Sequence, residues 1–414
     1  MLRFITTANA VLGVIFFVCY ALQLFYTILT LFRKPLTFKD APKTKRYAIL
    51  ISARNESAVL GHLLDSIRDQ DYPAENVASF VVADNCSDDT AAVASAHGAT
   101  VFERRDASHI GKGYALKFLL EQMGEKLHDF DACIVIDADN LLEPDYVSRM
   151  NDCFSGGKYR VITSYRNSKN YGDNWISSGS ALWFLREARQ LNAARSILGT
   201  SCAVSGTGFL VSRELLEEQG GWKHLLLIED IEFSVDLVTK GERIGYCHDA
   251  ILYDEQPVKL RQSWRQHVRW SYGYLQVLRH YGGKLVRGIF KGPTLGCYDM
   301  LMSICPAYFV TVAGLALNVF SVTQVALQGD LIPLLLSLGK VIIELYGLAF
   351  LVGLAATVTE WRRIRCANWR KVLSVFTFPL FMFTFIPEAI AAFFVRPQWK
   401  PIEHNNAVDL SDLK

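Results

Sequence analysis

The sequence predicts an α/β domain with a mostly parallel sheet, flanked by transmembrane helices and by helices at the membrane interface. Two features of the 414 residues lead to this prediction. Short apolar runs alternate with helical patterns in the centre of the chain, which is typical of parallel strands joined by helical crossovers. Long uncharged apolar stretches lie towards both ends, and about 20 such residues are enough to cross the hydrocarbon core of a bilayer.

The first apolar stretch runs from Phe4 to Phe32 without a charged side chain. We expect residues 1–33 to be a retained membrane anchor, because the stretch is too long for a signal peptide and no small-residue cleavage site follows it. Basic residues gather directly after it, at Arg33, Lys34, Lys39, Lys43, Lys45 and Arg46. Since positive charge concentrates on the cytosolic side of a span, the middle of the chain is expected in the cytosol.

Three apolar runs in the centre are expected to be strands: residues 47–52, 80–83 and 132–136. A helical pattern follows the first run, at Leu60, Leu63, Leu64 and Ile67. Each run ends in a polar turn, and these turns contain Asn55 and Glu56, Asp84, and the pair Asp137 and Asp139. Ligands of a parallel sheet bind at the carboxyl ends of its strands, so these side chains are expected at one binding edge.

The polar turns also have simpler interpretations. Asp137 and Asp139 can hold a divalent cation, which in turn can hold a diphosphate, but an Asp-x-Asp at a strand end is also common as a turn or a helix cap. Asp84 could cap the next helix, and Asn55 with Glu56 could form a capping pair. The occurrence of three such turns at one edge favours the binding interpretation.

Two loops add further candidates. Lys112 lies between two glycines, which let a backbone approach a ligand closely, and its ammonium group suits a phosphate. A surface lysine in a flexible loop is the alternative. Ser205, Gly206 and Thr207 belong to a loop of small residues that would let a bulky substrate approach the backbone.

Glu229 and Asp230 follow an apolar run at an expected helix start. A helix N-terminus stabilises an ionised carboxylate, so Asp230 is expected to be charged. Helix capping alone is the alternative. If residues 258–280 are helical, Gln266, Arg269 and Trp270 stand at i, i+3 and i+4 and share one face. An amide, a guanidinium group and a flat aromatic ring could then meet one ligand together, although an ordinary amphipathic helix would show the same stripe.

Asp137-Ala138-Asp139 followed by Gln266-His267-Val268-Arg269-Trp270 resembles the motif order of the family-2 inverting glycosyltransferases. The resemblance is to the membrane-embedded branch that includes cellulose, chitin, hyaluronan and poly-N-acetylglucosamine synthases, and it covers about residues 45–275. It implies a GT-A, Rossmann-like domain in the cytosol. Ile228 stands where the family has threonine, so a hydroxyl-dependent role at that position is not carried over.

The resemblance also implies roles for the candidate residues. Asp230, with Glu229, would be catalytic, and Asp230 would be the general base. Asp137 and Asp139 would bind Mg²⁺ or Mn²⁺ and the nucleotide sugar donor. The expected donor-binding residues are Asn55, Glu56, Asp84, Lys112, Asp137, Asp139, Gln266 and Arg269. The expected acceptor-binding residues are Trp270, Ser205, Gly206 and Thr207. A single in-line displacement would convert an α-linked donor, expected to carry UDP, into a β-linkage.

These considerations divide the chain into an anchor (1–33), a cytosolic glycosyltransferase domain (45–256), amphipathic interface helices (257–297), a C-terminal transmembrane region (298–397) and a tail (398–414). The turn Gln328–Asp330 carries no positive charge and is expected outside. The second candidate span is Met300–Gly329, which has no charged side chain. The later ones are Leu331–Thr359, interrupted by Lys340 and Glu344, and Val372–Val395, interrupted by Pro379, Pro387 and Glu388. If all four cross, the tail lies outside; if the last segment re-enters or lies at the interface, the tail returns to the cytosol.

Composition excludes other classes of function. A net charge of +2 without a basic-aromatic patch argues against nucleic acid, and nine scattered cysteines form no C-x-x-C pair. We expect a multi-pass plasma-membrane enzyme that extends a β-linked polysaccharide and exports it, with accessory export or modification proteins as further partners. The alternatives are a glycolipid glycosyltransferase that adds one sugar to a lipid acceptor, and a non-catalytic scaffold or transporter.

Overall fold

The computed structural model describes residues 2–327, 331–397, 404 and 406–413. The turn Gln328–Asp330 and the tail residues 398–403, 405 and 414 lie outside these ranges, and so does the expectation that this turn is external.

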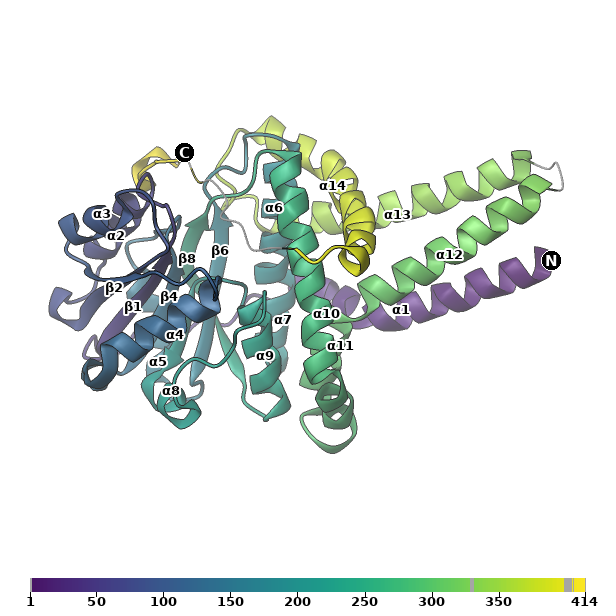
Figure 1. Ribbon diagram of the computed structural model, residues 1–414. Helices are drawn as coiled ribbons and strands as arrows, with labels where there is room; N and C mark the ends of the chain where they lie inside the picture. Colours follow the sequence, from purple (N-terminus) through teal and green to yellow (C-terminus); the bar gives the residue numbers. More distant parts are fainter. Residues whose placement is uncertain (1, 328–330, 398–403, 405, 414) are drawn as a thin grey trace.

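Within the described residues, eight strands form one sheet in the order β3-β2-β1-β4-β7-β6-β8-β5 (Figure 1). The strands are β1 (Tyr47–Ala53), β2 (Val77–Asp84), β3 (Thr100–Arg104), β4 (Ala132–Asp137), β5 (Leu141–Leu142), β6 (Val161–Ser168), β7 (Phe209–Ser212) and β8 (Ile244–Asp254). The three predicted strands are β1, β2 and β4, which pair in parallel. The predicted α/β fold is therefore confirmed, although β5 and β7 run antiparallel to their neighbours and make the sheet mixed.

Helices cover both faces of the sheet. They are α2 (Leu60–Arg68), α3 (Thr90–Ala96), α4 (Lys112–Met123), α5 (Tyr146–Ser155), α6 (Trp175–Arg186), α7 (Ala193–Leu198), α8 (Arg213–Gln219) and α9 (Glu229–Thr239), with the π-helix η3 (Glu187–Asn192) and the 3₁₀ turns η1 (Ala74–Asn76), η2 (Gly124–Asp129) and η4 (Leu410–Asp412). The buried residues of α2 are the four of the predicted helical pattern.

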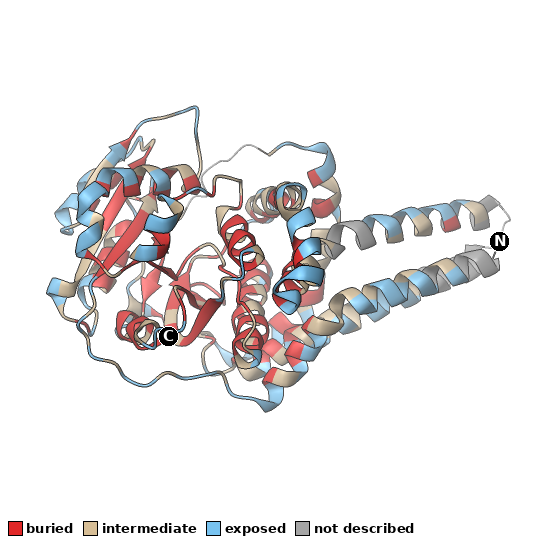
Figure 2. Cartoon of the chain, turned by 90° about the horizontal axis from the view of Figure 1, so that it is seen from below, coloured by how far each residue is buried: buried red, intermediate tan, exposed pale blue. Residues whose placement is uncertain are grey.

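Alternate residues of β1 belong to two separate buried clusters. Ala48 and Leu50 pack with α4, α6, α8 and α9, whereas Ile49 and Ile51 pack with α2, α3 and α5. Because both faces of the strand are covered, its sequence is continuously apolar instead of alternating. Figure 2 shows the strands buried between the two layers of helices.

The carboxyl ends of β1, β2 and β4 lie at one edge because these strands run in parallel. Ser52 is the partner of Val82 in β2 and of Asp137 in β4. The polar turns that follow these strands therefore meet at this edge, as the sequence predicts. On the other side of the antiparallel β7, β6 and β8 pair in parallel and bring Arg166 and Asp254 to the same edge.

The long helices after β8 are α10 (Leu260–Lys291), α11 (Thr294–Ile304), α12 (Pro306–Leu327), α13 (Leu331–Thr359) and α14 (Asn368–Phe394), and α1 (Leu2–Phe32) precedes the domain. Among the described residues, three stretches are long and apolar enough to cross a membrane: Ala10–Phe32, Gly339–Thr359 and Asn368–Phe394. In Figure 1, α1, α12 and α13 project away from the domain, and α10 and α11 run along its side, across the base of this arm.

Helix α14 packs on the domain more extensively than the other candidate spans, with a buried share of 39% against 17% for Ala10–Phe32 and for Gly339–Thr359. Its Phe378 and Phe381 belong to the same buried cluster as the sheet residues. A Cβ atom at Gly179 of α6 would overlap Phe381, so only glycine allows this close approach. Pro379 and Pro387 lie inside α14, which nevertheless continues as one helix.

Both ends of α14 lead to segments that contact the domain. Before it, Arg365 pairs with Glu143 at 2.6 Å. After it, the tail returns to the sheet edge, where Asp409 lies 2.6 Å from His62 and the carbonyl of Leu413 accepts a hydrogen bond from Arg365. The described residues on both flanks of α14 therefore lie against the domain.

Candidate active site

A cleft opens at the carboxyl ends of the strands, between the sheet edge and helices α6, α9 and α10. Its lining includes all predicted site residues except Asn55 and Thr207. Glu56, Asp84, Lys112, Asp137 and Asp139 come from the sheet edge. Ser205, Gly206, Glu229, Asp230, Gln266, Arg269 and Trp270 come from the loop before β7 and from α9 and α10.

Asn55 and Thr207 support the turns around the cleft. The side chain of Asn55, a residue with φ of 58°, accepts a hydrogen bond from the amide of Ser87 at 2.8 Å and so joins two turns. The hydroxyl of Thr207 accepts from the amide of Asp137 at 2.9 Å and donates to Asn140 at 2.6 Å. Direct contacts of these two residues with substrate stay predictions.

The carboxylate of Asp137 pairs with the ammonium group of Lys112, which also donates to the carbonyl of Gly206 at 2.8 Å. Burial lowers the pKa of Lys112, but the nearby carboxylates of Asp137 and Glu229 outweigh burial and raise it. Lys112 is therefore a charged group at the point where a donor phosphate is expected. Glycine is required at the neighbouring position 113, since a Cβ atom there would overlap the carbonyl oxygen of His224.

His404 of the C-terminal tail lies close to Asp139, the second aspartate of the Asp137-Ala138-Asp139 turn. Its Nε2 lies 3.8 Å from Asp139, and its Nδ1 lies 2.9 Å from Glu56. Burial lowers the pKa of His404, but Asp139 and Glu56 outweigh burial and raise it to about 10. Burial likewise raises the pKa of Glu56 to about 7, although the hydrogen bond with His404 opposes this. In this arrangement the imidazolium partly neutralises two buried carboxylates.

Asp84 is 3% exposed and accepts a hydrogen bond from the buried Arg104 at 2.6 Å. Burial raises the pKa of Asp84, and Arg104 opposes that effect. One carboxylate of the predicted donor site is thus fixed by a protein cation from β3.

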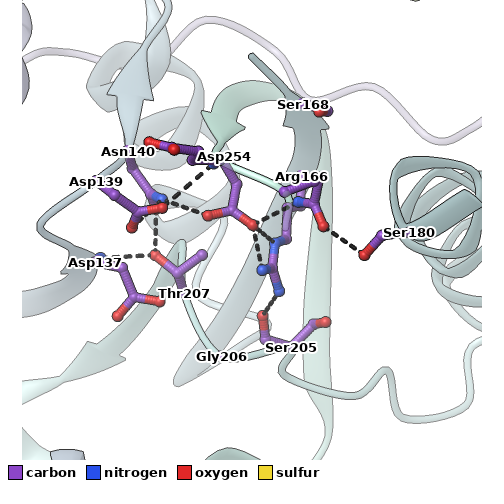
Figure 3. A network of polar contacts seen from close by, with 12 residues as sticks. Asp137, Asp139, Asn140, Arg166, Ser168, Ser180, Ser205, Gly206, Thr207 and Asp254 are labelled. Atoms are coloured by element: carbon purple, nitrogen blue, oxygen red, sulfur yellow. Dashed lines mark hydrogen bonds and ion pairs between the residues drawn. The ribbon is translucent and has the colours of Figure 1, made fainter. Parts of the chain in front are cut away.

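A second polar network supports the Asp137–Asp139 turn from the side of β6 and β8 (Figure 3). Arg166 donates to Asp254 at 2.8 Å and to the carbonyl of Ser205 at 3.0 Å. Asn140 donates to Asp254 at 3.0 Å and accepts from Thr207. The loop Ser205–Thr207 is therefore held against the two aspartates through hydrogen bonds on both of its sides.

Glu229 and Asp230 occupy the first turn of α9, where the sequence places them. Burial raises the pKa of Asp230, while the amides of Ile231 and Gly206 and the charge of Lys112 oppose this effect. Burial also raises the pKa of Glu229, together with the charge of Asp230. A carboxylate with a raised pKa in a cleft is suited to accept a proton near neutral pH.

The predicted stripe on α10 faces the cleft. Gln266, Arg269 and Trp270 all line it, and the guanidinium of Arg269 lies near the carboxylates of Glu229 and Asp230. Among the described residues, the buried Oε1 atom of Gln266 has no hydrogen-bond partner. An orphaned buried acceptor in a cleft lining is suited to receive a hydrogen bond from a ligand.

A divalent cation fits the residues at the sheet edge. Within the described residues, no group of three or more His, Cys, Asp or Glu side chains stands arranged as a metal centre. The carboxylates of Asp137 and Asp139 are instead paired with protein cations, Lys112 and His404. Carboxylate oxygens of this type suit Mg²⁺ or Mn²⁺.

Several cleft residues escaped sequence reasoning. Arg54 lies in the turn of Asn55 and Glu56 directly after β1, and Asp254 is the last residue of β8, so a position at a strand end was the available signal for both. His404 and Glu187 lie outside any strand or helix pattern that points to the cleft. Trp183 and Phe184 of α6 also line it, and nothing in their local sequence distinguishes them from core residues.

Comparisons with known proteins agree with this fold. The family described as "Glycosyltransferase like family 2" matches residues 42–273, more than half of the chain. The beta-monoglucosyldiacylglycerol synthase of Synechocystis is 24% identical over 58% of this chain and 51% of its own length. The poly-beta-1,6-N-acetyl-D-glucosamine synthase of Staphylococcus epidermidis is 22% identical over 59% of this chain and 58% of its own length.

The chain spans only about half the length of the curated relatives it matches. Among solved structures, the mannosyltransferase PcManGT from Pyrobaculum calidifontis, in complex with GDP-Man and Mn²⁺, matches with a TM-score of 0.58. The match covers 93% of this chain and 98% of that chain at 16% sequence identity. At this identity the likeness concerns the fold, and it extends beyond the domain to most of the chain.

Proposed function

The chain belongs to glycosyltransferase family 2, and from this premise we propose that it transfers a hexose, with inversion, from a UDP-sugar to a growing β-linked polysaccharide. The observation that carries the proposal is the distribution of charge in the cleft. Lys112 and Arg269 supply cations for a leaving diphosphate, and Asp230 supplies a buried carboxylate for the attacking hydroxyl.

On the donor side, Asp137 and Asp139 would hold Mg²⁺ or Mn²⁺. When bound, such a cation supplies positive charge that stabilises the diphosphate as the leaving group. Lys112 and Arg269 would bind the same phosphates. Glu56, in the turn after β1, and Asp84, at the end of β2, would bind the nucleoside. The oxygen of Gln266 that has no partner among the described residues would accept a hydrogen bond from the donor.

On the acceptor side, Asp230 would accept the proton of the attacking hydroxyl while the bond between the anomeric carbon and the phosphate oxygen breaks. The nucleoside diphosphate leaves with the electron pair of that bond. One displacement turns an α-linked donor into a β-linked product. Trp270 would stack on the acceptor ring, since the C–H face of a sugar suits an aromatic surface, and the loop Ser205–Thr207 would border it.

The proposed function implies a multi-pass protein of the plasma membrane with its catalytic domain in the cytosol. Support comes from the basic segment after α1 and from the apolar arm of α1, α12 and α13. The proposal includes export of the product, with or without accessory proteins, because a growing polysaccharide would leave the cleft beside the membrane helices.

A glycolipid product is the second candidate, and one contact favours it. Trp183 of the cleft lining packs on Phe385 of α14, with ring centroids 5.4 Å apart. An acceptor carried by a lipid could therefore reach the cleft along an apolar helix that lies at the membrane side of the domain.

Product size decides between the two. Purified full-length protein in lipid nanodiscs would be given a panel of nucleotide sugars with Mn²⁺, with and without added diacylglycerol, and UDP release and products would be measured. We expect a β-linked polymer from the UDP-sugar alone, and we expect Trp270→Ala to shorten it while hydrolysis of the donor by water persists. A lipid carrying a single sugar as sole product would refute the polymer, and no UDP release from any donor would refute the transferase.

A further inference from the structure

Glu187 lines the cleft but has no role in the reaction described above. It is the first residue of the π-helix η3, directly after α6. Single π-helical turns are rare and are frequent at functional sites, because they reorient side chains that a regular helix would point elsewhere. Glu187 is therefore a candidate for a further function in the cleft.

The carboxylate is held from one side only. Ser205 donates a hydrogen bond to its Oε2 atom at 3.1 Å. Within the described part of the chain, the other oxygen, Oε1, has no hydrogen-bond partner, and Glu187 belongs to the lining of the cleft. Burial raises the pKa of Glu187, while the charges of Arg195 and Arg166 and the Ser205 hydroxyl oppose this effect.

Glu187 and the proposed base Asp230 border the same loop. Ser205 contacts Glu187, and a Cβ atom on the next residue, Gly206, would lie 3.9 Å from a carboxylate oxygen of Asp230. The charge of Asp230 is also near enough to influence Glu187. Two carboxylates that line the cleft therefore approach neighbouring residues of one loop.

The surroundings of Glu187 are those of the acceptor side. Trp183 stands one helical turn before it, and Phe184 packs edge-on against Trp270 with ring centroids 5.9 Å apart. The donor side borders the same loop at the next residue, where Lys112 donates to the carbonyl of Gly206 at 2.8 Å. A sugar ring stacked on Trp270 would present one hydroxyl to Asp230 and a neighbouring one towards Glu187.

We propose that Glu187 binds a second hydroxyl of the acceptor sugar, next to the one that reacts, and thereby selects which hydroxyl Asp230 deprotonates. The inference rests on the proposed transferase function and adds an acceptor-specificity residue to it. A carboxylate is the appropriate group for this purpose, because it accepts strongly from a neutral hydroxyl and cannot be matched by an acceptor that lacks that hydroxyl.

The test measures discrimination between acceptors. Soluble acceptors would be the methyl β-glycosides of glucose and of N-acetylglucosamine and their monodeoxy forms, used with the UDP-sugar that supports UDP release. Wild type should lose about 10-fold or more in kcat/KM with one deoxy form that retains the reacting hydroxyl, the scale of a hydrogen bond to an ionised group. Glu187→Gln should lower kcat/KM for the parent acceptor by a similar factor and reduce the discrimination between the parent and the deoxy form. Glu187→Ala should abolish this discrimination.

Two measurements keep this role separate from a structural one. UDP release by hydrolysis without acceptor should stay within about twofold of wild type in both variants, because Glu187 does not contact the donor; Glu217→Gln, in a surface ion pair with His128, serves as the control. Ser205→Ala leaves the carboxylate in place and should reduce discrimination less than Glu187→Ala.

Unchanged discrimination in Glu187→Ala would overturn the inference, and so would a parallel loss of donor hydrolysis, which would indicate a structural role. Both results leave the proposed transferase standing. Absence of UDP release by the wild-type protein would instead overturn the transferase itself.

Discussion

Gly206 illustrates at the scale of one residue how the cleft is assembled. Its φ of 75° lies in the left-handed region, which glycine adopts without strain. Its carbonyl accepts from Lys112, and its amide faces Asp230. One residue without a side chain thus contacts a group of the proposed donor side and the proposed base, so a substitution there would disturb both.

Replacing Asp139 with Asn should abolish metal-dependent turnover of the donor. The amide removes one negative charge from the proposed cation site and leaves the imidazolium of His404 without one of its partners. UDP release would be measured against Mn²⁺ concentration, with a thermal unfolding curve to show that the fold survives. Full activity of the variant, or wild-type activity that a chelator does not change, would contradict the metal assignment.

Asp230→Asn should lower transfer by about 100-fold or more while donor affinity stays nearly the same, as expected for loss of a positioned general base. Because burial raises the pKa of Asp230, the wild-type rate should fall with decreasing pH at a higher pH than for an exposed aspartate. The carboxylate must be deprotonated to act, so activity lies above the pKa and is lost below it.

Asp230→Asn should not show this loss of rate with decreasing pH. Nucleotide binding measured by calorimetry and transfer rates measured from pH 5 to 9 would check both statements. If binding and transfer fell together, Asp230 would be a donor-site residue.

At the scale of elements, α10 and α14 are joined by a buried pair behind the α10 stripe. His267 lies 3.0 Å from Glu388, and their side chains are 1% and 0% exposed. The ring of His267 lies 5.1 Å from Trp270 and stacks on Phe385 at 4.3 Å. The position of Trp270 in the cleft is therefore set partly by a contact with α14.

Glu388→Ala should destabilise the protein and impair transfer, because it leaves a buried His267 nitrogen unpaired at a cost of about 1–3 kcal/mol. Glu388→Gln keeps a hydrogen-bonding group and should be milder. Glu344→Ala is a matched control, since Glu344 and Lys340 are 3.8 Å apart and mostly exposed.

Thermal unfolding and UDP release in nanodiscs would compare the three variants. Equal effects of Glu388→Ala and Glu344→Ala would show that the buried pair does not hold α10 in place.

At the scale of the whole molecule, the candidate spans differ in how much of their surface protein covers. The buried share is 39% for Asn368–Phe394 of α14 and 17% for Gly339–Thr359 of α13. Phe378 and Phe381 of α14 form part of the domain core, whereas Ile343 and Leu351 of α13 are exposed. Apolar exposure is typical of lipid-facing surface, whereas α14 buries one side against protein.

This organisation predicts that the C-terminus lies on the same side of the membrane as the catalytic domain. Asn406 donates to Glu255 at 3.2 Å, and Leu413 packs with Leu141 and Tyr253. An epitope tag added after Lys414 should be digested by protease in inside-out vesicles together with the domain, and both should be protected in right-side-out vesicles. Opposite accessibility of tag and domain would show that α14 crosses.

The sequence by itself determined the parts of this protein that depend on local patterns. Apolar periodicity identified β1, β2, β4 and α2, because burial of a strand or of one helix face imposes a repeat on neighbouring residues. Parallel pairing then required the turns with Glu56, Asp84, Asp137 and Asp139 to meet, and all four line one cleft. The spacing of Gln266, Arg269 and Trp270 likewise placed them on one face.

Only the tertiary structure decided the features that depend on contacts between distant segments. His404 lies near Asp139 because the tail folds back, and the sequence of the tail has no periodicity that predicts this. Glu187 lines the cleft at the start of a π-helical turn, which no residue spacing predicts. Helix α14 has the length and composition of a span, yet it packs on α6 because Gly179 leaves room for Phe381. Composition reports how apolar a surface is. Whether lipid or protein covers that surface depends on what the rest of the chain places against it.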